Sequence, residues 1–148
     1  MACPFFMPTQ ELSDGGWLHP ARLPLGGGWR GQCCAPGHEG AEPSVDELRQ
    51  MCNLGYASGC SRLPATRSSD AVRFGVAHDH GSQLDVLFVH EIGHRPGEHG
   101  TLLYDTSRGE WLSSPLDLRI GKMAECYVQS YLSRRNRPIL DSAPRANS

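Results

Sequence analysis

The middle of the chain alternates hydrophobic and polar positions in short runs rich in β-branched and aromatic residues. These runs predict strands at residues 71–78, 85–90, 101–104 and around Trp111. The phrases at 79–82 and 106–109 have tight-turn chemistry, whereas the Arg-Pro-Gly phrase at 95–97 indicates a longer connection. The pattern therefore predicts an antiparallel meander of three or four strands.

Two other segments have helical periodicity. Ser44 and Glu47 form the Ser-x-x-Glu pattern of a capping box, so we expect a short helix over residues 45–53, with Cys52 on or near its inward face. Residues 116–135 carry an apolar stripe about one helical face wide, formed by Leu118, Ile120, Met123, Ala124, Tyr127, Val128, Tyr131 and Leu132. This longer helix should lie across the sheet and close the core.

The first 43 residues are interrupted by prolines and glycines and are expected to form an extended, turn-rich segment that wraps the rest. Together the patterns predict an α+β fold: a loop-rich, cysteine-bearing N-terminal segment with a short helix, a small antiparallel sheet, and a C-terminal helix packed on it. We expect one metal-stapled domain over residues 1–135, divided into a cysteine-rich part (1–66) and a sheet-plus-helix part (67–135). Residues 136–148 should form a flexible tail.

Composition and charge narrow the class of protein. The chain has 148 residues with 17 Gly, 11 Pro and 39% apolar residues, so its core is modest and its N-terminal part needs an internal staple. A net charge of −2 does not indicate a nucleic-acid partner. The N-terminus lacks the basic start and apolar stretch of an export signal, and no apolar run is long enough to span a membrane. We therefore expect a cytoplasmic protein without a membrane partner, and the oligomeric state stays open.

Five of the six cysteines fall within the first sixty residues. Because the cytoplasm is reducing, grouped thiols there favour metal binding or thiol redox chemistry over a disulfide framework. The expected ligands are Cys3, Cys33, Cys52 and Cys60, separated by 29, 18 and 7 residues. These spacings lack the close Cys-x-x-Cys pairs typical of structural zinc sites, so we interpret the set as ligands of an iron–sulfur cluster of the 4Fe-4S type. Zinc is the alternative, and metal-free thiol or disulfide chemistry is a third.

The other two cysteines are not expected to be ligands. Cys34 is adjacent to Cys33, and neighbouring side chains of an extended segment point to opposite sides. Cys126 lies on the final helix, where a small buried hydrophobic residue is the usual role. Pro4 beside Cys3, and the glycines near the other ligands, should bring backbone amides close to sulfur, and such hydrogen bonds tune a cluster.

Several phrases of the chain carry a resemblance, namely Cys3-Pro-Phe-Phe, Gly31-Gln-Cys33, Cys52-Asn-Leu-Gly-Tyr56 with Cys60, Asp70-Ala-Val-Arg-Phe74, His94-Arg-Pro96 and His99-Gly100. The pattern resembles a family of short, largely uncharacterised bacterial proteins and covers most of the chain. The resemblance implies a four-cysteine metal or cluster site and a small sheet domain, without a defined activity. Cys34 departs from the pattern as an extra thiol.

His90, Glu91 and His94 match the His-Glu-x-x-His motif of zinc metalloproteases, which places two imidazoles one helical turn apart. Here a β-rich run precedes His90, and glycine and proline follow at once, so we expect a strand leading into a loop. Two histidines four residues apart on a strand lie roughly 13 Å apart, too far for one zinc ion. His78 with His80, and His38 with Glu39, are expected in solvated turns.

Three hypotheses follow. The first is a cytoplasmic iron–sulfur protein in electron transfer or redox sensing, with a redox protein as its partner. The second is a zinc-stapled binding or interaction module. The third is a zinc hydrolase that uses His90 and His94, with Glu91 as general base. The first two are not enzymes by themselves, and we assign no catalytic residue.

Overall fold

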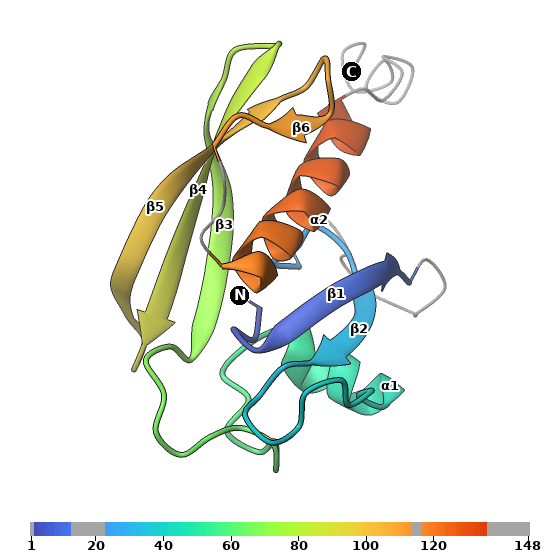
Figure 1. The fold of residues 1–148 in the computed structure, drawn as a ribbon, viewed down its shortest axis with the longest axis vertical. Coiled ribbons are helices and arrows are strands. Elements are labelled where there is room, and N and C mark those ends of the chain that lie inside the picture. The colour runs from blue at the N-terminus through green and yellow to red at the C-terminus, as the bar shows by residue number, and fades with distance from the viewer. Residues whose placement is uncertain (1, 13–22, 114–116, 136–148) are drawn as a thin grey trace, which may run out of the picture.

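The computed structural model describes residues 2–12, 23–113 and 117–135. Within this part of the chain the fold is α+β, as the sequence predicts, with a two-stranded sheet, a four-stranded sheet and a long C-terminal helix (Figure 1). The tail predicted at 136–148 and the predicted first residue of the final helix lie outside the described residues. None of the helices described combines the length and apolar character needed to cross a membrane.

The larger sheet is an antiparallel meander. It consists, in order across the sheet, of β3 (Ala71–Asp79), β4 (Gln83–Ile92), β5 (Arg95–Asp105) and β6 (Glu110–Trp111). The four predicted strands are confirmed, and the predicted turns connect β3 to β4 and β5 to β6. Helix α2 (Leu118–Arg135) lies along one face of this sheet, as expected (Figure 1).

The prediction of a longer connection at 95–97 is wrong, because these residues belong to β5. The turn is formed instead by Gly93 and His94, whose φ angles are 58° and 63°. Two successive positive φ angles give a tight hairpin turn whose twist matches that of the strands. Pro96 is tolerated in β5 because β6 pairs only with the last two residues of that strand, which leaves its beginning at a sheet edge.

The first 43 residues contain a strand pair that the sequence does not predict. β1 (Phe6–Glu11) and β2 (Trp29–Cys33) are antiparallel, with Pro8 opposite Gly31. A Cβ atom added to Gly31 would lie 2.0 Å from the carbonyl oxygen of Met7, so glycine is what allows the strands to approach. A bulge after Pro8 accommodates the proline.

Substitution of Gly31 tests this close approach. We expect Gly31→Ala to lower the free energy of unfolding by about 2 kcal/mol, because the added methyl group forces the two strands apart. Gly75→Ala is the matched control, since Gly75 lies in β3 with no atom within 4 Å of its Cβ position. Chemical denaturation of both variants measures the difference, and an equal loss of stability would contradict this account of the hairpin.

The predicted short helix is present as α1 (Val45–Glu47), which continues directly into a π-helical turn, η2 (Leu48–Cys52). The capping box is confirmed: the Glu47 N–H donates to Ser44 Oγ at 3.2 Å, and the Ser44 N–H donates to Glu47 Oε1 at 2.8 Å. Val45 is exposed, whereas Leu48 is buried in the core. The chain thus widens from α- to π-helical geometry where it reaches Cys52, and such turns are frequent at functional sites.

Two buried clusters meet at α2. One joins α2 to β1, β2 and η2, with Phe6, Leu25, Trp29, Leu48, Met123 and Cys126 among its members. The other joins α2 to the large sheet through Leu84, Val86, Tyr104 and Val128. Cys126 is 2% exposed, which confirms its expected role as a small buried hydrophobic residue. Helix α2 therefore fixes the cysteine-bearing part of the chain against the sheet.

Candidate metal centre

The four predicted cysteine ligands border one recess. Cys3 precedes β1, Cys33 ends β2, Cys52 ends η2, and Cys60 lies in the loop that follows. The rest of the lining is mostly apolar, with Phe5, Phe6, Pro43, Met51 and Ala57 beside Glu47 and Arg62. Neither Cys34 nor Cys126 is among the described residues that line this recess. The structure thus brings together the four thiols selected by spacing and leaves out the other two.

Backbone hydrogen bonds hold the contributing segments in place. The Cys3 N–H donates to the carbonyl oxygen of Cys52 at 3.0 Å, which joins the N-terminal segment to the end of η2. Ala2 and Val72 exchange hydrogen bonds of 2.7 and 2.8 Å, which tie the same segment to β3. The Cys34 N–H donates to Phe5 O at 2.7 Å, which fixes the end of β2. Backbone hydrogen bonds therefore fix the segments that border the recess.

At Cys3 and Cys33, the sulfur accepts a hydrogen bond from the backbone amide two residues further along the chain. The Ala35 N–H donates to Cys33 Sγ at 3.4 Å, and the Phe5 N–H donates to the Cys3 thiol. Hydrogen bonds of this kind stabilise negative charge on sulfur, as metal binding requires. The proline after Cys3 was expected to favour such a contact, and the contact is present there.

Asn53 positions Cys52 from the buried side. Its side-chain oxygen accepts from the Trp29 N–H at 3.1 Å, and its amide donates to Trp29 O and Leu48 O, each at 2.9 Å. The carboxamide thus pairs with Trp29 as the peptide of a neighbouring strand would. Since Asn53 is fully buried, this single side chain joins β2 to the end of η2.

Burial makes the thiols of Cys3 and Cys52 poor nucleophiles. It raises the pKa of Cys3 to about 11 and that of Cys52 to about 12, and the neighbouring thiols add to both shifts. Reactive cysteines need the opposite shift, since the thiolate is the nucleophile. These two thiols are therefore suited to a partner that displaces their protons, as a bound metal does, and unsuited to metal-free thiol catalysis.

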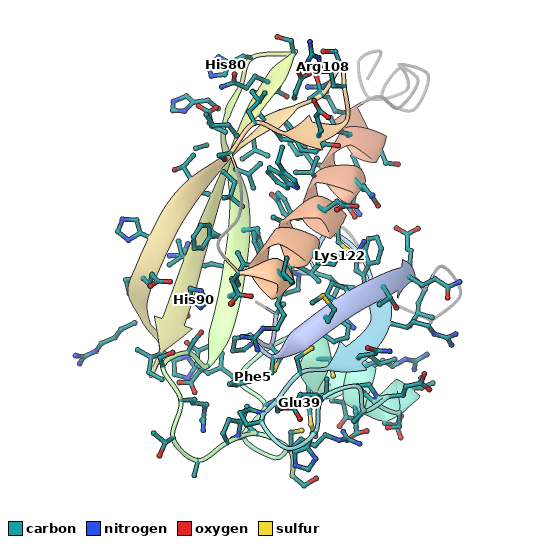
Figure 2. All side chains as sticks on the ribbon, viewed as in Figure 1. Phe5, Glu39, His80, His90, Arg108 and Lys122 are labelled. Atoms are coloured by element: carbon teal, nitrogen blue, oxygen red, sulfur yellow. The ribbon has the colours of Figure 1, made fainter. Side chains whose placement is uncertain are left out.

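Two arginines lie near the thiols. Arg62 lines the recess and donates to Glu47 Oε2 at 2.8 Å, so the capping-box carboxylate also anchors the loop after Cys60. Arg119, at the start of α2, places its guanidinium 5.4 Å from the centre of the Phe5 ring and lowers the pKa of Cys3, although burial outweighs it. Figure 2 shows Phe5 next to the start of β1, between α2 and the loop that carries Glu39. Both cations can offset part of the negative charge of four thiolates.

The loop between Cys52 and Cys60 docks on the sheet through Tyr56. The Tyr56 hydroxyl donates to Glu91 Oε1 at 2.7 Å and accepts from the His94 N–H at 3.0 Å. The Tyr56 ring stacks on the His94 imidazole with 4.1 Å between centroids. The other Glu91 oxygen accepts from Arg73 at 2.9 Å. These contacts hold Tyr56 at a φ of 50°, which a non-glycine residue seldom adopts.

The residues of the His-Glu-x-x-His motif make contacts within the fold. Its residues lie on β4 and in the following turn, not on a helix, so the predicted strand is confirmed. The turn after the strand is tighter than the predicted loop. Glu91 and His94 contact Tyr56, whereas the His90 ring contacts Ser69. Among the residues that the structure describes, no group of three or more His, Cys, Asp or Glu side chains is arranged to hold a single metal ion.

The other histidines singled out by the sequence lie in or beside turns, as expected. His78 and His80 flank the β3–β4 turn, and both approach Asp85 Oδ2, at 3.5 and 3.4 Å. His38 and Glu39 lie in an exposed turn after Cys34. Figure 2 shows His80 and Glu39 at opposite ends of the molecule, so the two pairs do not contribute to one site.

No protein-family model, curated protein or solved structure matches this chain. The resemblance to a bacterial family with the same cysteine phrases therefore stays a prediction. The function has to be inferred from the geometry of the recess.

Sequence reasoning missed the residues that support the ligands. Asn53 and Tyr56 lie within the phrase from Cys52 to Cys60. Polar side chains so near a ligand often position it through hydrogen bonds, so their supporting role could have been predicted. Arg62 and Arg73 carry no such signal, because their partners, Glu47 and Glu91, are distant in sequence.

Proposed function

We propose that the protein carries an iron–sulfur cluster on Cys3, Cys33, Cys52 and Cys60 and acts in electron transfer or redox sensing with a redox protein as its partner. The observation that carries this proposal is the convergence of four thiols, from four separate segments, on one largely apolar recess. Four thiolates are the usual ligand set of such a cluster.

The arrangement of the thiols favours a cluster over zinc. A tetrahedral zinc site with zinc–sulfur bonds of about 2.3 Å holds its four sulfurs roughly 3.8 Å apart. A cluster places its own atoms between the thiolates, which suits ligands donated singly from separate segments. Cys3, Cys33, Cys52 and Cys60 come from four such segments, without a close Cys-x-x-Cys pair.

A bound cluster supplies a reversible one-electron change. The residues of this chain hold it and set its surroundings. The Phe5 and Ala35 amides donate to ligand sulfurs, and hydrogen bonds to sulfur are one determinant of the reduction potential. The apolar side chains of Phe6 and Met51 border the recess and limit the access of water, which is a second determinant.

A reversible redox titration tests the function. The protein purified without oxygen is reduced with dithionite and reoxidised with ferricyanide while its visible absorption is recorded. We expect the absorption to bleach and recover over repeated cycles, with a paramagnetic signal in the reduced form. A protein without visible absorption, or one whose absorption does not respond to either reagent, would contradict a redox function and leave the zinc-stapled module.

The contact between Tyr56 and Glu91 provides a prediction about the retention of the metal. We expect Tyr56→Phe to release metal to a chelator several-fold faster than the wild-type protein, because the loop that leads from Cys52 to Cys60 loses a charge-assisted hydrogen bond worth roughly 1.5–3 kcal/mol. Tyr131→Phe is the matched control, since Tyr131 donates to a carboxylate oxygen of Asp79 at the same distance of 2.7 Å but distant from the cysteines.

The release rate is followed by the absorbance of the chelator complex. Equal rates in the two tyrosine variants would show that docking of the loop on the sheet does not stabilise the centre.

A further inference from the structure

A second cavity lies between the large sheet and the start of α2. It has a volume of about 460 Å³, within the range of small-molecule sites, and residues from β4, β5 and α2 line it. Its apolar surface comes from Phe88, Leu102 and Ile120. Its polar side chains are those of His90, Glu98, His99, Thr101, Ser113 and Asp117. None of the four cysteine ligands lines it, so this cavity is separate from the proposed metal centre.

The sheet shapes the apolar wall of this cavity. Phe88 on β4 is paired with Gly100 on β5, and a Cβ atom on Gly100 would lie 2.8 Å from the Phe88 ring. The ring therefore lies across the glycine. Leu102 follows on the same face of β5, and Ile120 faces them from the first turns of α2.

The hydrogen bonds of His90 define which ring nitrogen carries its proton. The Ser69 hydroxyl donates to Ala71 O at 3.1 Å, so its oxygen accepts from His90 Nδ1–H at 3.0 Å. Burial lowers the pKa of His90, so the ring is neutral at pH 7. Its Nε2 atom then has a free lone pair and accepts hydrogen bonds. This nitrogen lies 3.9 Å from Glu98 Oε1, too far for a direct hydrogen bond.

Among the described residues that line the cavity, Glu98 and Asp117 are acidic and no lysine or arginine is present. Glu98 is exposed and free to turn toward a ligand. Asp117 accepts from the Arg119 N–H at 2.9 Å and pairs with the Arg119 guanidinium at 3.4 Å, which uses the nearest cation. A ligand nitrogen placed between His90 Nε2 and Glu98 Oε1 can lie about 2.9 Å from both, because these atoms are 3.9 Å apart.

We propose that this cavity binds a small organic ammonium ion attached to an apolar body. The ammonium group donates to His90 Nε2 and to the Glu98 carboxylate, and the body packs on Phe88, Leu102 and Ile120. This gives His90, the first residue of the His-Glu-x-x-His motif, a binding role that needs no metal. The site does not depend on the proposed cluster.

Three compounds that share one ring test the charge requirement. Benzylamine, benzyl alcohol and benzoate are titrated into the purified full-length protein by isothermal titration calorimetry. We expect benzylamine to bind, benzyl alcohol to bind up to about fivefold more weakly and benzoate not to bind, because an ion pair in a partly exposed site contributes up to roughly 1 kcal/mol. Equal affinity for benzylamine and benzyl alcohol, or no binding of benzylamine, would overturn the proposal.

Substitutions locate the bound ammonium group. Glu98→Gln and His90→Gln should each weaken benzylamine binding about fivefold. Glu110→Gln and His80→Gln are the matched controls, since they remove a carboxylate and an imidazole outside the cavity and should leave the affinity unchanged. Glu98 is exposed, so its variant tests the site even if the His90 variant folds poorly. Unchanged affinity in Glu98→Gln would place any binding elsewhere and contradict the assignment. Because the calorimetric result does not involve the metal, its failure leaves the cluster proposal unaffected.

Discussion

Cys33→Ser will lose the metal centre, whereas Cys34→Ser will keep it. The two cysteines are adjacent, so the variants match in position, size and chemistry, but of the two only Cys33 lines the recess with the other three proposed ligands. Cys33 also accepts the Ala35 N–H at its sulfur. A serine oxygen is a poor ligand for the metals that thiolates prefer. We expect less than about a tenth of the wild-type metal content in Cys33→Ser and full content in Cys34→Ser.

Metal analysis of the two variants purified side by side gives the answer. A third variant, Cys126→Ser, controls for the loss of any cysteine, because Cys126 is buried in the core and is not among the described residues that line the recess. A buried hydroxyl group weakens the fold of this variant, so its metal content is compared per folded chain. Loss of metal in Cys34→Ser with retention in Cys33→Ser would contradict this prediction and show that Cys34 is the ligand.

Asn53→Ala will lower the free energy of unfolding by about 3 kcal/mol, because it leaves buried polar groups without partners. The Trp29 N–H and Trp29 O both depend on the Asn53 side chain, whereas Leu48 O also accepts from the Asn53 backbone N–H. Two orphaned groups at 1–3 kcal/mol each account for the magnitude. Since β2 ends at Cys33 and η2 ends at Cys52, the same variant should also bind metal less tightly.

Gln83→Ala is the control for the loss of an amide side chain. The Gln83 amide donates only to the Asp85 carboxylate, near the exposed β3–β4 turn, and we expect a cost below about 1 kcal/mol. Urea denaturation of both metal-free variants separates the effect on the fold from that on the metal. Equal costs would show that the Asn53 side chain does not join β2 to η2.

The sequence predicts the parts of the fold that depend on local pattern. The strands of the large sheet and the final helix carry periodic apolar residues, and Ser44 with Glu47 marks the start of the short helix. The β1–β2 pair escapes prediction because it depends on how Gly31 fits against the Met7 carbonyl, a contact between separate segments. The turn at Gly93 and His94 could not be predicted either, because histidine seldom adopts a positive φ.

The candidate site shows the same division. The spacing of the cysteines selects four thiols that line one recess. Side-chain alternation allows only one of Cys33 and Cys34 to face the other thiols, and the Gly31-Gln-Cys33 phrase favours Cys33. The supporting contacts of Tyr56 with Glu91 could not be predicted, because their two residues are 35 positions apart. The same contacts explain why a protease-like motif is present without the helix it requires: Glu91 and His94 hold the cysteine loop against the sheet.

The central claim, that the four cysteines hold an iron–sulfur cluster, is tested most directly by the composition of the protein purified without oxygen. Iron, sulfide and zinc are measured per chain on the sample whose visible absorption is recorded. We expect about four iron and four sulfide per chain with broad visible absorption. About one zinc per chain, without iron or colour, would contradict the claim and show that the four thiols close on a structural ion.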